Sequence, residues 1–128
     1  KNVGRGILKP GLGLIGDAHA GCERQISLLA VEVVELLCRD QGIAAQPGSF
    51  AENIAMRGIN AALLRKGDRL QIGEALLEVI GIGKEPWEPA TYSYQGFSLL
   101  AVEGVFCRVL EGGRVAQGDR IRILAPGE

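Results

Sequence analysis

Two related stretches, Lys66-Gly67-Asp68-Arg69-Leu70-Gln71-Ile72 and Gln117-Gly118-Asp119-Arg120-Ile121-Arg122-Ile123, carry the clearest structural signal in the sequence. In each, a Gly-Asp turn leads into residues that alternate between polar and apolar side chains. This alternation has the period of a strand with one buried face. Each repeat therefore predicts a tight turn followed by a half-buried β-strand.

Two hairpins are expected around these repeats. After the first repeat, Gly73-Glu74 closes a turn into a strand over 75–82. Before the second, residues 111–113 close a turn between strands over 105–110 and 114–116. Glycine is suited to such short connections because it adopts the positive φ angles that they require. The C-terminal half is thus predicted to be a set of short antiparallel strands.

The N-terminal half mixes strand and helix patterns. Its predicted elements are a strand over 25–29, a helix over 30–41 with Gly42 as its stop, a brief strand over 53–56, one helical turn over 59–64, and then a long surface loop over 83–96. The fold class that follows is mainly β (α+β): a small closed β-barrel of mostly antiparallel strands with one or two short helices. Residues 1–128 are expected to form a single domain.

Composition excludes several classes of function. The chain has 128 residues, 47% of them apolar, and fourteen basic against fifteen acidic residues, for a net charge of -1. This balance removes the broad attraction to phosphate backbones and anionic lipid, so neither nucleic acid nor membrane is an expected partner. The sequence shows no signal pattern and no apolar run long enough to span a membrane, which favours a cytoplasmic protein. With three cysteines and one histidine, neither a disulfide framework nor a structural zinc site is expected.

A glycine-bracketed loop over 16–21 gathers Asp17 and His19, and Arg24 follows it. Such loops bind anions through backbone N–H groups and a guanidinium. The residues alone favour the alternative that Asp17 caps a turn and His19 pairs with a buried carbonyl. The overlapping string Gly11-Leu12-Gly13-Leu14-Ile15-Gly16 matches a dinucleotide motif, but Pro10 precedes it and loop residues follow, so no bound nucleotide is expected.

Glu52 and Asn53 stand directly before the predicted strand over 53–56, after a Pro-Gly turn. Their polar side chains suit two roles. They orient a ligand, or Asn53 pairs with backbone groups of a neighbouring segment. The sequence leaves these two interpretations even.

Taken together, several stretches resemble one known family, the molybdenum cofactor sulfurase C-terminal (MOSC) domain, in its small stand-alone bacterial form. The matching stretches, in chain order over nearly the whole sequence, are Pro10 to Gly21, Arg24 to Ala30, Pro47 to Ile54, Leu70 to Ala75, Gly81 to Lys84, Glu103 to Leu110, and Gly118-Asp119. The resemblance implies a compact barrel of mainly antiparallel strands that binds a molybdenum-pterin cofactor or handles sulfur destined for it. Its expected partners are molybdopterin itself or a cofactor-dependent enzyme.

The resemblance also implies which residues bind which part of the cofactor. The candidates for the cofactor's phosphate are Arg24, Lys84 and Arg108, and those for its polar edge are Asp17, His19 and Asn53. Family members typically place a cysteine in the loop after Gly-Lys, where a thiolate carries a persulfide or binds molybdenum. Here Pro86 and Ala90 stand near those positions. No metal ligand is therefore assigned, and catalysis is left open.

Cys22 is the one candidate to replace the missing thiol, since it follows the His19 loop and lies two residues before Arg24. Packing within the loop is the favoured alternative for it, because no resolving thiol is near in sequence. Cys38 and Cys107 are expected in the core. The leading interpretation is a cofactor-binding domain, with two alternatives: a molybdenum-dependent reductase of N-hydroxylated compounds, and a degenerate barrel that docks a protein partner.

Overall fold

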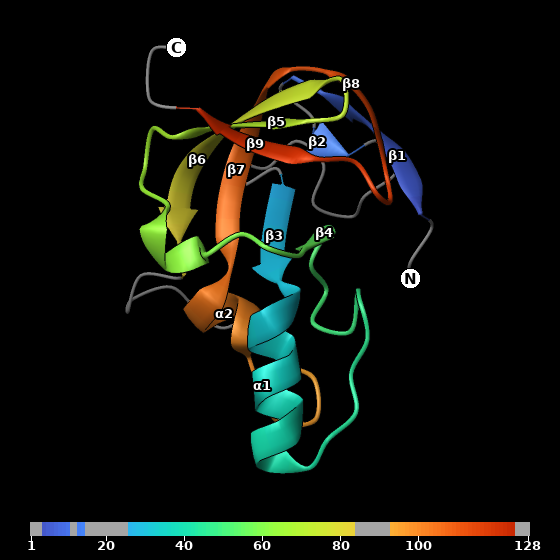
Figure 1. Cartoon of the computed structure of the whole chain (residues 1–128), viewed down its shortest axis with the longest axis vertical. Coiled ribbons are helices and arrows are strands. Elements are labelled where there is room, and N and C mark those ends of the chain that lie inside the picture. Colours follow the sequence, from blue (N-terminus) through green and yellow to red (C-terminus); the bar gives the residue numbers. More distant parts are fainter. Residues whose placement is uncertain (1–3, 11–12, 15–25, 84–92, 125–128) are drawn as a thin grey trace.

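The computed structural model describes residues 4–10, 13–14, 26–83 and 93–124. Its strands form two sheets, one of six strands in the order β4-β3-β7-β6-β5-β9 and one of three in the order β2-β1-β8 (Figure 1). The strands of the larger sheet are β3 (Ile26–Ala30), β4 (Ile54–Met56), β5 (Arg69–Ile72), β6 (Ala75–Ile82), β7 (Val105–Glu111) and β9 (Ile121–Leu124). Those of the smaller are β1 (Arg5–Lys9), β2 (Gly13–Leu14) and β8 (Gly113–Ala116).

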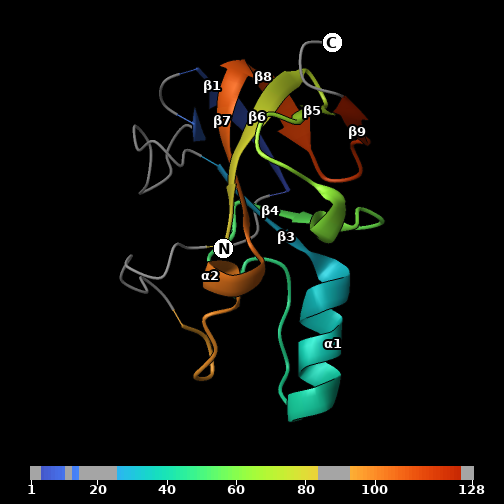
Figure 2. The ribbon, with the colours of Figure 1, turned by 90° about the vertical axis from the view of Figure 1, so that its left-hand side faces the viewer.

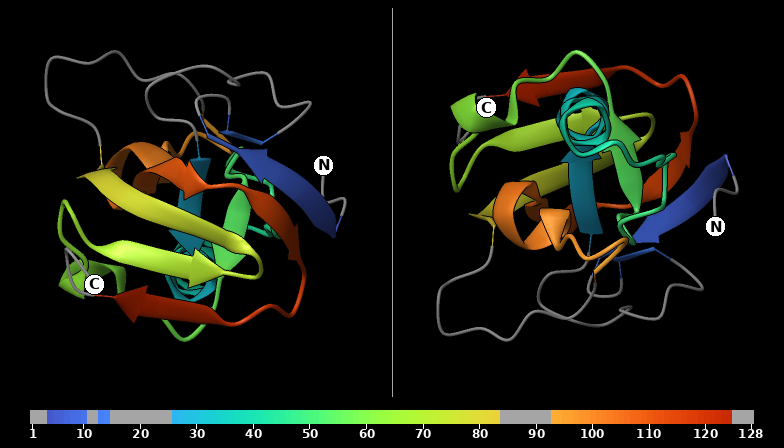
Figure 3. Two further views of the ribbon diagram at one scale, coloured as in Figure 1. Left: turned by 90° about the horizontal axis from the view of Figure 1, so that it is seen from above. Right: turned by 90° about the horizontal axis from the view of Figure 1, so that it is seen from below.

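This architecture confirms the mainly β, barrel-like fold class. Neighbouring strands are antiparallel except β3 and β4, which run parallel. The larger sheet curls, as the views from above and below show (Figure 3). The split into two sheets was not predicted from the sequence.

The two Gly-Asp repeats fold alike and lie side by side. Asp68 accepts a hydrogen bond from the backbone N–H of Arg65 at 2.9 Å, and Asp119 accepts one from the N–H of Ala116 at 2.8 Å. Each aspartate side chain therefore closes its own turn by bonding to the backbone N–H three residues before it. The strands that follow, β5 and β9, pair with each other with Leu70 opposite Ile123. The predicted strands and the hairpin from β5 into β6 are confirmed.

The second predicted hairpin is wrong. Both strands exist, but β8 pairs with β1, whereas β7 pairs with β3 and β6. Contacts with Glu74 in the β5–β6 turn hold β8 in this position, because the backbone N–H of Arg114 donates to the Glu74 carboxylate and the Arg114 carbonyl accepts from the Glu74 N–H, both at 3.0 Å. A Cβ on Gly112 would lie 2.6 Å from the Leu8 carbonyl oxygen, so glycine lets β1 cross close to this turn.

The helical predictions hold. Helix α1 spans Val31–Gln41 and ends at Gly42, whose φ of 65° places it in the left-handed conformation that terminates helices. A 3-10 turn, η1, spans Ala61–Leu63, and a second short helix, α2, spans Leu99–Glu103. Both α-helices lie at one end of the molecule, with most of the strands at the other (Figures 1 and 2). Among the described residues, no helix is long and apolar enough to cross a membrane.

Two apolar clusters cover opposite faces of β3. Ile26, Leu28 and Ala30 join the main core inside the curled sheet, where Cys107 and Val105 of β7 also lie. Leu29 faces the other way and packs with Val34 and Phe50 in a second cluster under the helices. All five residues of β3 are buried for this reason. The strand therefore ties the sheet to α1 and to the loop that precedes β4.

Candidate functional site

Of the residues expected to bind a cofactor, the structure describes Asn53 and Arg108. Asp17, His19, Arg24 and Lys84 lie outside the described residues, as does Cys22. The described chain nevertheless shows where these segments join the fold. Residue 26 begins β3 beside β7, and residue 83 follows β6 on the other side of β7. The two segments are thus attached to strands that flank the same central strand.

Asn53 is held by Ser27 of β3. Its side-chain Oδ1 accepts from the Ser27 backbone N–H at 2.8 Å and from the Ser27 Oγ at 3.1 Å. The Asn53 N–H in turn donates to the carbonyl of Ser27 at 3.0 Å and to its Oγ at 3.1 Å. These bonds fix the start of β4 against β3. Of the two interpretations that the sequence left even, the geometry supports the pairing of Asn53 with a neighbouring segment.

Glu52 organises the loop before β4. Its carboxylate is buried and accepts hydrogen bonds from the backbone N–H groups of Gly48 at 3.0 Å and of Phe50 at 3.2 Å. Ala51, between them, has a φ of 66°, a conformation that non-glycine residues rarely adopt. A carboxylate that bonds to two N–H groups of its own loop offsets that strain. The interpretation of Glu52 as a ligand-orienting residue has no support in these contacts.

Tyr94 ties the segment over 93–98 to this same loop. Its hydroxyl donates to the carbonyl of Ala44 at 2.9 Å, and its ring meets that of Phe50 edge-on, with centroids 5.4 Å apart. Gln95 and Gly96 both have positive φ, which closes a tight turn between Tyr94 and Phe97. The Tyr94 ring therefore packs against the second cluster.

Arg108 lies on the outer face of β7. Its Nε donates to Glu78 Oε1 of β6 at 2.6 Å, and its side chain is 54% exposed. Ser27 pairs with Phe106, two positions along β7, so Ser27 and Arg108 project from the same face of the sheet. Cys107, the residue before Arg108, pairs with Ile26. Ile26 is the first residue of β3. The structure therefore brings Arg108 and the Asn53–Ser27 pair to one face near the start of β3.

The ion pair leaves Arg108 able to bind an anion. A guanidinium carries five N–H donors in a planar fork, of which the bond to Glu78 uses one. An ion pair this exposed contributes little to stability, typically below about 1 kcal/mol. Glu78 therefore orients the guanidinium, and the remaining N–H donors stay available for an anionic ligand.

The described thiols do not fit the binding of a metal. Cys107 points into the core and is fully buried, and burial raises the pKa of its thiol to about 12. Cys38, on α1, is half-buried against the second cluster. Both were expected in core positions; the structure confirms this for Cys107, whereas Cys38 lies at the edge of the second cluster. Within the described ranges, no group of histidine, cysteine and acidic residues is arranged to hold a metal ion.

Together these features define a small β domain in which two segments join strands beside an exposed arginine. The MOSC domain family model matches residues 16–84, more than half of the chain. The chain belongs to the MOSC domain family, which is associated with the molybdenum cofactor. No curated protein matches the sequence.

Solved structures share the fold. The YUAD protein from Bacillus subtilis superposes with a TM-score of 0.74 at 23% identity, covering 96% of this chain and 86% of that one. YiiM from Escherichia coli superposes with a TM-score of 0.67 at 22% identity, and YiiM from Geobacillus stearothermophilus with 0.68 at 19%. Coverage for these two is 95% and 94% of this chain, but 63% and 60% of theirs. The chain thus spans less than two thirds of either YiiM.

Proposed function

We propose that this domain binds the molybdenum-pterin cofactor reversibly through the cofactor's phosphate, in handling the cofactor or sulfur destined for it. The observation that carries the proposal is Arg108, an exposed guanidinium on the face of β7 next to the start of β3. Arg24 belongs to the segment before β3, and Lys84 to the segment after β6. Both are proposed as further phosphate ligands. When bound, the cofactor would supply redox chemistry at molybdenum or serve as the acceptor of sulfur.

The described residues fit one part of this cofactor and not another. A phosphate suits Arg108 because a planar guanidinium donates two parallel hydrogen bonds to a phosphate group. Covalent attachment to molybdenum needs an accessible thiolate, whereas Cys107 is buried with a raised pKa. The proposal is therefore limited to reversible binding. Asp17 and His19 are proposed to contact the polar edge of the cofactor. Asn53 is proposed to position β3, the strand that follows their segment, through its bonds to Ser27.

The test is a titration of the protein with isolated molybdopterin under argon. Wild type is compared with Arg24→Ala, Arg108→Ala and, as a matched control, Arg122→Ala, which removes an exposed arginine from β9. A hydrogen bond to a charged group is worth roughly 1.5–3 kcal/mol, so Arg24→Ala should weaken binding about ten- to a hundredfold. Arg108 is exposed and shared with Glu78, so its loss should cost only about two- to fivefold.

Two outcomes contradict the proposal. Wild type without binding at tens of micromolar, equivalent to about -6 to -7 kcal/mol, removes the cofactor from the account. An effect of Arg122→Ala equal to that of Arg108→Ala shows a general response to charge instead of a site. In the first case, the docking of a protein partner becomes the better interpretation.

A further inference from the structure

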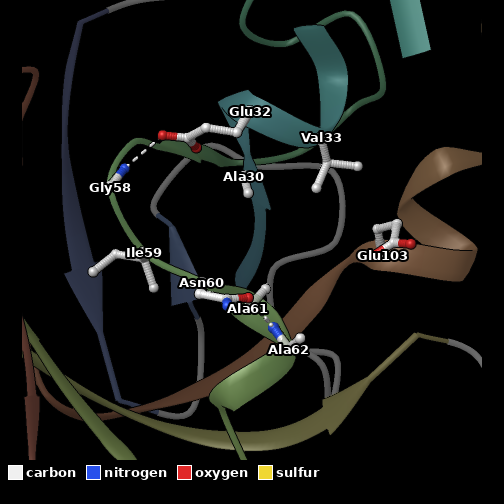
Figure 4. A pocket seen from close by; sticks show the side chains of 9 residues that line it. All are labelled: Ala30, Glu32, Val33, Gly58, Ile59, Asn60, Ala61, Ala62 and Glu103. Atoms are coloured by element: carbon white, nitrogen blue, oxygen red, sulfur yellow. Dashed lines mark hydrogen bonds between the residues drawn. The ribbon is translucent and has the colours of Figure 1, made fainter. Parts of the chain in front are cut away.

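A hollow of about 470 Å³ opens at the far end of β3 from Arg108. It lies where β3 runs into α1, and its lining comes from that junction, from the segment around η1 and from the end of α2 (Figure 4). The lining residues are Ala30, Glu32, Val33, Gly58, Ile59, Asn60, Ala61, Ala62 and Glu103. Four residues separate Ile26 from Ala30, about 13 Å along a strand. The hollow therefore lies about 13 Å along β3 from the Arg108 end of the proposed cofactor site.

Its surface combines a floor of carbon atoms with two carboxylates. Ala30 and Ala61 are buried parts of the main core, and Val33 and Ile59 pack against that core. Glu32 and Glu103 lie on opposite sides of Ala30 in Figure 4. Among the described lining residues, none is basic. The size and the mostly apolar lining with few polar groups are typical of sites for small ligands.

The carboxylate of Glu32 is kept ionised. It accepts a hydrogen bond from the backbone N–H of Gly58 at 2.8 Å, and this bond lowers the pKa of Glu32. Arg57, whose charge also lowers the pKa of Glu32, is engaged with Glu35 at 3.0 Å on the neighbouring turn of α1. The opening thus presents negative charge beside apolar surface.

We propose that this hollow binds a small organic ammonium ion with an apolar group attached. The apolar group would lie on Ala30, Val33 and Ile59, and the ammonium would face the Glu103 carboxylate, while Glu32 adds negative charge on the other side of Ala30. Charge complementarity selects this ligand class, because a carboxylate ligand would meet two like charges in a described lining that contains no basic residue, and the cation that acts on Glu32, Arg57, is already paired with Glu35. The proposal does not depend on cofactor binding.

Benzylamine is the probe, with benzyl alcohol and phenylacetate as its neutral and anionic counterparts. Amide NMR correlation spectra of the full chain are recorded as each compound is added up to about 10 mM, the range of weak fragment binding. Benzylamine should give saturable shifts at Val33, Ile59 and Ala61. Benzyl alcohol should bind several-fold more weakly, and phenylacetate should give no saturable shift there.

Two variants and a control locate the site. Ala62→Trp places a large ring on an exposed lining position and should abolish the shifts. Glu103→Gln removes one exposed charge and should weaken benzylamine about two- to fivefold. Glu111→Gln removes an exposed glutamate from the end of β7, away from the lining, and should change nothing. Equal binding of phenylacetate, full binding by Ala62→Trp, or no saturable shift in wild type would each overturn the proposal.

Discussion

Asn53→Ala tests the finding that this residue serves the fold more than a ligand. In the native structure its Oδ1 accepts two hydrogen bonds from Ser27, at 2.8 and 3.1 Å, and Ser27 is only 8% exposed. Removal of the acceptor leaves the Ser27 backbone N–H without that partner in a buried position. A net hydrogen bond is worth about 1 kcal/mol, and an unsatisfied buried group costs about 1–3 kcal/mol. We expect Asn53→Ala to lower the free energy of unfolding by about 2–3 kcal/mol.

Urea unfolding followed by circular dichroism measures this change, with the slope checked for two-state behaviour. Asn60→Ala is the matched control, because Asn60 also accepts a backbone N–H bond, from Ala62 at 3.1 Å, but in an exposed position. Its cost should be about 0.5–1 kcal/mol. Asn53→Asp keeps the acceptor oxygen and should fall between wild type and Asn53→Ala. If Asn53→Ala costs no more than Asn60→Ala, the reasoning from the buried Ser27 N–H is refuted.

Further outcomes are expected at three residues. Gly112→Ala should destabilise the fold by about 1–3 kcal/mol in urea, because its Cβ would lie 2.6 Å from the Leu8 carbonyl oxygen, and an unchanged midpoint would contradict this. Cys107 should resist iodoacetamide in the native protein and react in urea, as mass spectrometry will show. Because burial raises the pKa of Cys107 to about 12, the unfolded state loses its proton first and stability should fall as pH rises above about 9. The pKa of Glu32 is lowered, so its effect on stability runs in the opposite direction: the stability that its bond to Gly58 adds should be lost as pH falls below about 4.5. Glu32→Gln should reduce that acid dependence.

The candidate site divides between what sequence reasoning reached and what it did not. Arg108 was predicted from the family resemblance, and the structure places it on the face of β7 near the start of β3. Its partner Glu78 was not predicted, since 30 residues separate the two and the sequence does not show that β6 and β7 pair. The hollow beside Glu32 and Glu103 was also missed. Its lining comes from three segments, and a cavity has no local signature in a sequence.

The sequence by itself determined the elements whose cause is local. A Gly-Asp turn before alternating residues specifies a strand, and Gly42 ends α1 because glycine adopts the left-handed conformation without strain. Apart from the β5–β6 hairpin, the pairing of the strands was decided only by the tertiary structure. The local sequence does not show that β8 leaves β7 for β1, because that choice depends on Glu74, 40 residues from Arg114, and on how closely β1 passes Gly112. The role of Asn53 likewise became definite only when β3 placed Ser27 against it, since a short amide side chain bonds to whichever buried backbone group the fold brings within reach.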